Sequence, residues 1–159
     1  MPRSLPTRSH VLAFGSLCAL ALTAVAAPTF AASDPVATRV AGFKALGGAY
    51  KKLNDTLKSG APDKAVMAVA AKDIGIARKG IYSWFPAGSG LKPGVKTAAK
   101  PEIWTKPVDF KAAQDGFAKQ ADALQKAVAG GNADMIAAEA KKLGGTCKTC
   151  HESFRVPKE

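Results

Sequence analysis

From residue 34 onward, apolar residues recur every three or four positions in four segments, which is the spacing of one face of an α-helix. The first segment begins at Asp34-Pro35, a capping side chain followed by proline at the first helical position, and it stops at Ser59-Gly60-Ala61-Pro62. The second runs from Pro62 to Trp84. The predicted buried stripes are Val36, Val40, Phe43, Leu46, Tyr50, Leu53 and Leu57, and then Val66, Val69, Ile74, Ala77, Ile81 and Trp84.

A connection over residues 85–106 precedes the other two segments, with a short turn expected at Pro101-Glu102-Ile103-Trp104. The third helix follows Thr105 and ends at Gly130-Gly131, and Asn132 caps the fourth. The glycine pair Gly144-Gly145 lowers the stability of the fourth helix and leaves room for a bulky neighbour. The predicted stripes are Phe110, Ala113, Phe117, Ala121, Leu124 and Val128, and then Ile136, Ala140, Leu143, Cys147, Cys150 and Phe154.

Short loops within each pair of helices imply antiparallel neighbours, so the pattern predicts an all-α, up-down-up-down four-helix bundle. In that topology, the ends of the second and fourth helices lie beside the starts of the first and third. Seven of the nine aromatic residues after residue 31 map to this end of the bundle, and Tyr50 and Phe117 lie further along. The seven, which we expect to form a pocket wall, are Phe43, Tyr82, Trp84, Phe85, Trp104, Phe110 and Phe154.

The segment Cys147-Lys148-Thr149-Cys150-His151 lies at the same end and reads C-x-x-C-H, the attachment motif of a c-type haem. On a helix, residues three and four apart are neighbours, so both thiols and the imidazole share one face. The thiols can then join the two vinyl groups of one porphyrin while the imidazole reaches the iron. The motif predicts one haem c, covalently bound through Cys147 and Cys150, with His151 as the ligand to the iron.

Two other chemistries use similar residues. A structural zinc site takes four ligands, and Cys147, Cys150 and His151 would need a carboxylate to complete the set. The remaining cysteine and histidine, Cys18 and His10, lie in the leader described next. A thioredoxin-like C-x-x-C belongs to a βαβ context, and this chain shows no strand-like alternation after the leader.

Residues 1–31 are typical of a secretory signal peptide, which leaves a domain of residues 32–159. Arg3 and Arg8 precede an apolar run of 17 residues that begins at Val11. Cleavage after Ala26 or after Ala31 fits the small residues there, and we favour Ala31. A run of this length is also at the short limit for a membrane anchor. We expect export to the periplasm, an oxidising compartment in which haem attachment would consume both thiols.

Positive charge exceeds negative charge along the whole chain. The chain has 23 Lys and Arg against 12 Asp and Glu, a formal net charge of +11, and loss of Arg3 and Arg8 would leave +9. The charges are scattered and the chain is exported, so nucleic acid is not an expected partner. A basic surface of this kind is either simply solvated, or it attracts acidic redox partner proteins or anionic membrane.

These features resemble the cytochrome c' family of class II c-type cytochromes, over essentially the whole chain after the leader. The ending Cys147 to Arg155 is similar to the family's C-K-x-C-H-x-x-[FY]-R. Three further stretches are similar to family features: Arg39-Val40-Ala41-Gly42-Phe43-Lys44, Trp84-Phe85-Pro86-Ala87-Gly88-Ser89 and Thr97-Ala98-Ala99-Lys100-Pro101-Glu102-Ile103-Trp104. The resemblance implies that Arg39 lies near a haem propionate, Phe43 over the distal face and Arg155 beside the proximal face. It also implies a homodimer through the first two helices.

In some relatives, a methionine at the Phe43 position makes the iron six-coordinate and low-spin. The methionines after the leader, Met67 and Met135, are both expected far from the iron, since Met135 precedes His151 by 16 residues, about 24 Å of helix. We therefore expect a five-coordinate iron that transfers electrons, binds the diatomic gases NO or CO, or both. The alternatives are a low-spin, six-coordinate electron carrier and a haem peroxidase. No enzymatic activity is expected, because a peroxidase would need a distal acid–base side chain and no second histidine follows the leader.

Overall fold

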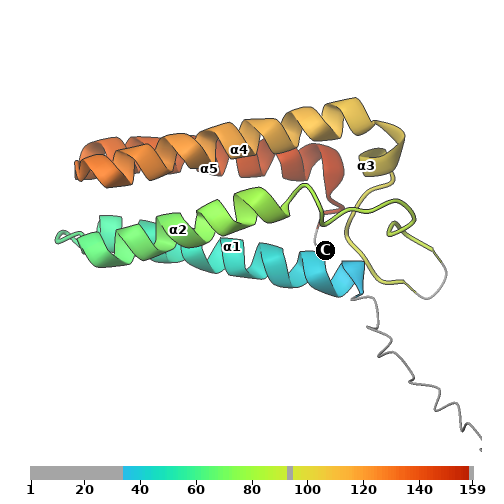
Figure 1. The fold of residues 1–159 in the computed structure, drawn as a ribbon, viewed down its shortest axis with the longest axis horizontal. Coiled ribbons are helices and arrows are strands. Elements are labelled where there is room, and N and C mark those ends of the chain that lie inside the picture. Colours follow the sequence, from blue (N-terminus) through green and yellow to red (C-terminus); the bar gives the residue numbers. More distant parts are fainter. Residues whose placement is uncertain (1–33, 93–94, 158–159) are drawn as a thin grey trace, which may run out of the picture. The chain divides into compact units, whose positions relative to one another are not determined.

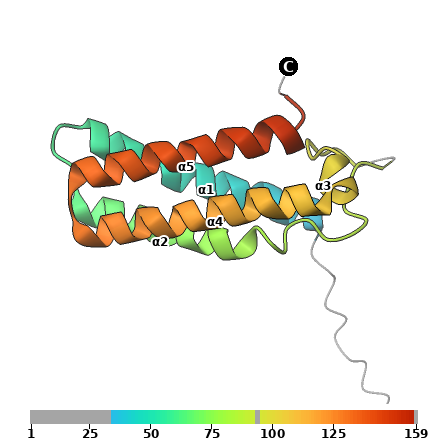
Figure 2. The same cartoon turned by 90° about the horizontal axis from the view of Figure 1, so that it is seen from above.

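Four long helices and one short helix make up a computed structural model that describes residues 34–92 and 95–157 (Figure 1). The helices are α1 (Pro35–Lys58), α2 (Lys64–Gly80), α3 (Glu102–Thr105), α4 (Pro107–Gly130) and α5 (Ala133–Phe154). The long helices alternate in direction, so the predicted all-α, antiparallel, up-down-up-down bundle is confirmed (Figures 1 and 2). The expected signal peptide and the boundary after Ala31 lie outside the described residues.

Capping side chains fix where the long helices begin. The Asp34 carboxylate accepts a hydrogen bond from the backbone N–H of Val36 at 2.9 Å, and the Asn132 side chain accepts one from Met135 at 3.0 Å. Each satisfies a backbone donor that the helix itself leaves unpaired. At the other end of α4, Gly131 takes a left-handed conformation with φ 73°, which costs glycine no steric clash. The predicted start of α1 and the turn between α4 and α5 are therefore confirmed.

All four long helices contribute large aliphatic side chains to the core between them. The largest fully buried ones are Leu53, Ile74, Leu124, Ile136 and Leu143. The predicted stripe of α2 is wrong in its first half. Val66 and Val69 are 38% and 55% exposed, and Met67 and Ala70 are buried in their place. The second half of the stripe is confirmed, since Ile74, Ala77, Ile81 and Trp84 are buried.

The second helix ends at Gly80 rather than at Trp84 as the sequence predicted. The backbone N–H and the hydroxyl of Ser83 both donate to the Gly80 carbonyl, each at 2.9 Å, and turn the chain there. The Ile81 carbonyl, which the helix leaves without a partner, accepts a hydrogen bond from the buried amide of Gln114 on α4 at 2.8 Å. This turn directs the connection, described over residues 81–92 and 95–101, across the end of the bundle beside α3 (Figure 1).

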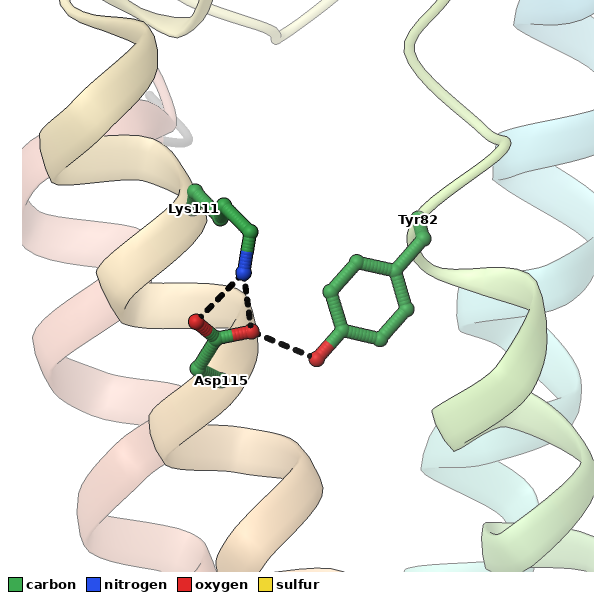
Figure 3. Close-up of polar contacts among 3 residues, drawn as sticks. All are labelled: Tyr82, Lys111 and Asp115. Atoms are coloured by element: carbon green, nitrogen blue, oxygen red, sulfur yellow. Dashed lines mark hydrogen bonds and ion pairs between the residues drawn. The ribbon is translucent and has the colours of Figure 1, made fainter.

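Tyr82 does not join the aromatic pocket wall that the sequence predicted. Its side chain is 47% exposed, and its hydroxyl donates to the Asp115 carboxylate on α4 at 2.8 Å (Figure 3). The Lys111 ammonium donates to both oxygens of the same carboxylate. The bonds from Lys111 and then Tyr82 hold the pKa of Asp115 below its usual range. This surface cluster ties the end of α2 to α4.

Across the two described stretches, the helices are all too short or too polar to cross a bilayer.

Candidate functional site

A cavity of about 670 Å³ lies between α1 and α5, at the end of the bundle that holds Cys147 and Cys150. α1 packs mainly on α2 and α5 mainly on α4, so the seam between α1 and α5 is the least closely packed. Most of the lining is apolar and much of it is aromatic. The aromatic lining residues are Phe43, Tyr50, Phe85, Phe110, Phe117 and Phe154.

The C-x-x-C-H motif lies on the last turns of α5, and Cys147, Cys150 and His151 all line the cavity, as their helical spacing predicted. Both thiols are free and half-buried, and burial raises the pKa of each. They are therefore neutral thiols at neutral pH. Loss of solvent around the ring and then the charge of Arg155 lower the pKa of His151, which favours the neutral imidazole that a metal requires.

Arg39 is the buried charge of the site, with 3% of its surface exposed. Its guanidinium donates to the hydroxyl and the carbonyl of Ser89, at 3.1 and 2.9 Å, and to the Thr97 hydroxyl at 2.7 Å. It lies 5.4 Å from the centroid of the Phe85 ring. Burial lowers the pKa of Arg39, opposed by Asp34, and a guanidinium remains charged in a protein. Arg39 therefore holds the segment between α2 and α3 against α1 through these hydrogen bonds, and it also lines the cavity.

Replacing Arg39 should destabilise the bundle strongly. In Arg39→Gln, three charge-assisted hydrogen bonds are lost and the buried Ser89 carbonyl loses its partner. We therefore expect the free energy of unfolding to fall by about 3 kcal/mol. The matched control is Arg78→Gln, which breaks a partly exposed ion pair with Asp122 and should cost under about 1 kcal/mol. Urea denaturation of the two variants gives both values, and equal losses would contradict a structural role for the Arg39 bonds.

Arg155 reaches the cavity by a route that the sequence did not predict. The resemblance implied a place for it beside the proximal face, and no change of conformation was expected there, but α5 ends at Phe154 and Arg155 is extended, with φ −124° and ψ 134°. It forms an antiparallel bridge with Ala99. The bridge is fixed by backbone hydrogen bonds from Lys100 to Phe154 at 3.0 Å and from Val156 to Ala98 at 2.8 Å. The connection, rather than the helix, therefore sets the position of Arg155.

The predicted gathering of aromatic rings is present, although its membership differs. Edge-to-face contacts join Trp84 to Phe43, Phe85 to Phe110, and Phe110 to Phe154, with ring centroids 4.9, 5.0 and 5.1 Å apart. Such pairs are the preferred arrangement of aromatic quadrupoles.

Two aromatic lining residues, Tyr50 and Phe117, were predicted to lie away from the pocket, yet the cavity extends along the seam as far as both. The Tyr50 hydroxyl donates to the Ala140 carbonyl at 3.0 Å and rests against Gly144, where a side chain would collide with it. The glycine pair in the sequence was the available signal for this close approach.

Neither methionine lies at the cavity, as predicted. Met67 is buried in the core, and Met135 is 61% exposed near the start of α5. In residues 34–92 and 95–157, no three His, Cys, Asp or Glu side chains are grouped so that they could hold a metal ion.

The cavity suits a large, mainly apolar group that carries carboxylates. Its volume falls in the range that holds cofactors and drug-sized ligands. Its walls are aromatic and aliphatic, two thiols and one imidazole open onto it, and Arg39 and Arg155 supply positive charge. The family model for cytochrome C' matches residues 34–155, which is nearly the whole described chain. The chain belongs to the cytochrome c' family.

Individual relatives agree with this assignment. The chain is 36% identical over 118 residues to a cytochrome c' from Pararhodospirillum photometricum, covering 74% of this chain and 92% of the relative. It is similar to the solved cytochrome c' of Rubrivivax gelatinosus, with a TM-score of 0.71 and 30% identity over 77% of this chain and 94% of that one.

A nitric oxide complex of a variant cytochrome c prime from Alcaligenes xylosoxidans is also similar to this chain. Its TM-score is 0.72 with 25% identity, over 79% of this chain and 95% of that one. Like other proteins of the cytochrome c' family, this chain has haem c as its cofactor, and Cys147 and Cys150 form the covalent attachment motif.

Proposed function

We propose that this protein is an exported cytochrome of the c' family that binds diatomic gases, transfers electrons, or does both. His151 would be the only ligand that the protein supplies to the iron. Bound haem c would supply an iron centre that takes up electrons and small gases. The observation that carries the proposal is the set of side chains around the cavity, in which His151 is the one uncommitted ligand after Cys147 and Cys150 are used.

The other candidate ligands in the lining are poorly suited to iron. The Tyr50 hydroxyl already donates to the Ala140 carbonyl and is packed against α5. Lys44 is exposed, and an ammonium group has no lone pair to donate. The Phe43 ring faces the cavity and also offers no lone pair. These features support a five-coordinate iron with one position left for a gas. Absorption spectra of the purified ferric, ferrous and CO-treated protein test the proposal, and low-spin ferric protein at neutral pH would contradict it.

Phe43→Met should convert the iron from five- to six-coordinate. Met is flexible and close in size to Phe, so its thioether could occupy the space of the ring and supply the missing ligand. We expect a low-spin ferric spectrum and association of CO slowed by at least tenfold, since the thioether must first leave. The control is Phe43→Leu, which removes the ring without adding a ligand and should stay high-spin. Identical spectra for the two variants would place residue 43 away from the iron.

Two arginines are suited to hold the carboxylates of the cofactor and to guide its ligands. Three of the five N–H donors of Arg39 are used by Ser89 and Thr97, which leaves two for a propionate. Arg155 is held at the cavity beside the end of α5, close enough to His151 for its charge to lower the histidine pKa. We propose that Arg155 contacts the proximal side and could bond a gas that arrives there.

Electron transfer is supported by the charge around the cavity. The lining includes Arg39, Lys44 and Arg155 but, among the described residues, no Asp or Glu. Arg39 is buried, but Lys44 is exposed and Arg155 is partly exposed, and these two charges would attract an acidic redox partner protein. Reduction by such a donor that slows as salt is added would favour the carrier role, because salt screens the attraction. Tight gas binding without rapid reduction would favour the gas-binding role.

An enzymatic role has little support in the lining. A peroxidase needs a general acid–base side chain over the open position. Among the described lining residues there is neither a carboxylate nor a second histidine, so we propose no catalysed reaction.

One solved relative, with a TM-score of 0.72 and 26% identity, is named for its ligand-controlled dimer dissociation. A homodimer of this chain is a proposal on that basis, and export to the periplasm is a proposal on the basis of residues 1–31.

A further inference from the structure

The indole of Trp84 occupies a slot that two glycines leave open. A Cβ atom at Gly42 on α1 would lie 2.6 Å from the indole Cε2, and one at Gly80, the last residue of α2, would lie 2.8 Å from the same atom. Both distances are well below a normal carbon–carbon contact. Trp84 is 9% exposed and is therefore enclosed between the two helices. The backbones of α1 and α2 both lie close against the ring.

The same indole lies behind Phe43. The two rings meet edge to face, with centroids 4.9 Å apart and planes at 72°. Phe85 approaches Phe43 as well, with centroids 6.0 Å apart. Phe43 and Phe85 both line the cavity, whereas Trp84 does not. Trp84 therefore borders the side of Phe43 that faces away from the cavity.

This arrangement restricts how Phe43 can move. A phenylalanine on a helix has few rotamers that avoid the preceding turn. To withdraw from the cavity, the ring must enter space that the indole fills, and the indole itself lies close against the backbone at Gly42 and Gly80. Close-packed interiors transmit such constraints because they contain few voids.

We infer that Trp84 is a positioning residue that holds the Phe43 ring at the cavity and thereby limits the size of the ligand that enters. The inference rests on the proposed function, in which a ligand reaches the iron past Phe43. A smaller side chain at position 84 would leave space into which the Phe43 ring could withdraw. The association rate of large ligands would increase more than that of small ligands.

The test compares two probes on the haem-loaded protein, carbon monoxide and n-butyl isocyanide. In Trp84→Phe, association of the isocyanide should be faster by about tenfold, equivalent to about 1.4 kcal/mol in the barrier, while association of CO changes less. The matched control is Trp104→Phe, because Trp104 contacts Phe85 rather than Phe43 and does not line the cavity. This control should leave the ratio of the two rates unchanged. A purely structural role for Trp84 would lower the melting temperature without altering that ratio.

A second comparison asks whether the effect passes through Phe43. In a Phe43→Ala background, Trp84→Phe should no longer change the rates, and the urea midpoints of the single and double variants should be non-additive, since the two rings are in contact. If Trp84→Phe folds poorly, Trp84→Leu also leaves a smaller side chain at this position and should likewise speed association of the isocyanide. Equal rates in wild type and both variants, with normal CO binding, would overturn the inference alone. A wild-type protein that binds no CO would overturn the proposed function.

Discussion

A chain with Cys147→Ala and Cys150→Ala should show no pigment on a denaturing gel, whereas the wild-type band should remain coloured. The two thiols are the only cysteine side chains in the described residues, and both line the cavity. Thioether bonds survive denaturation, but a haem held only by coordination and packing does not. The expected effect is complete loss of covalent haem, measured by haem staining and by the mass of the intact chain.

The matched control for this experiment lies within the motif itself. Thr149 stands between the cysteines, is exposed, and its hydroxyl donates only to the Gly145 carbonyl of its own helix. Thr149→Ala should therefore keep the full complement of haem. Colourless wild-type protein that contains zinc, made in a host able to attach haem, would contradict the assignment and favour the metal alternative.

A chain from which haem is absent should also lose much of its stability, because the cavity would be left unfilled. A residual void costs about 24 cal/mol per Å³, so 670 Å³ would cost roughly 16 kcal/mol if the walls did not move. This upper limit equals or exceeds the whole stability of a typical domain, about 5–15 kcal/mol. The walls are therefore expected to move inward or to admit water. We expect helical circular dichroism to persist while cooperative unfolding is lost and hydrophobic dyes bind.

A substitution elsewhere in the core gives the scale for this loss. Leu53 is fully buried outside the cavity lining, and Leu53→Ala should cost about 2–5 kcal/mol while unfolding stays cooperative. The haem-free chain should be less stable than the haem-loaded Leu53→Ala variant in urea. If haem-free and haem-loaded chains melted at the same temperature, the cofactor would lie at the surface and the aromatic cavity would have another purpose.

The sequence predicted those features that depend on neighbouring residues. Caps at Asp34 and Asn132, the turn at Gly131 and the motif at the end of α5 are local, and each lies where the sequence placed it. The bundle topology followed from loop lengths. The gathering of aromatics at one end followed from the topology.

Features that depend on distant segments were not predictable in the same way. Arg39 meets Ser89 and Thr97, which lie 50 and 58 residues away, and nothing near Arg39 in the sequence indicates those partners. The extended conformation of Arg155 depends on its bridge to Ala99, which helical periodicity cannot represent. In the first half of α2, Met67 and Ala70 are buried in place of Val66 and Val69, although the apolar spacing allowed either set.

The open seam between α1 and α5 has a consequence for the order in which the site closes. Each hairpin, α1 with α2 and α4 with α5, holds its own extensive contacts, and the two are further joined through α2 and α4. Partial opening therefore requires least free energy at the α1–α5 seam, where Cys147 and Cys150 lie. Such an opening would expose both thiols while the hairpins stay folded. Amide hydrogen exchange would detect it as faster exchange in the last turns of α5 than in the middle of α4. A ring joined to Cys147 and Cys150 would fill the cavity at this seam, so the haem-loaded protein should open there less often.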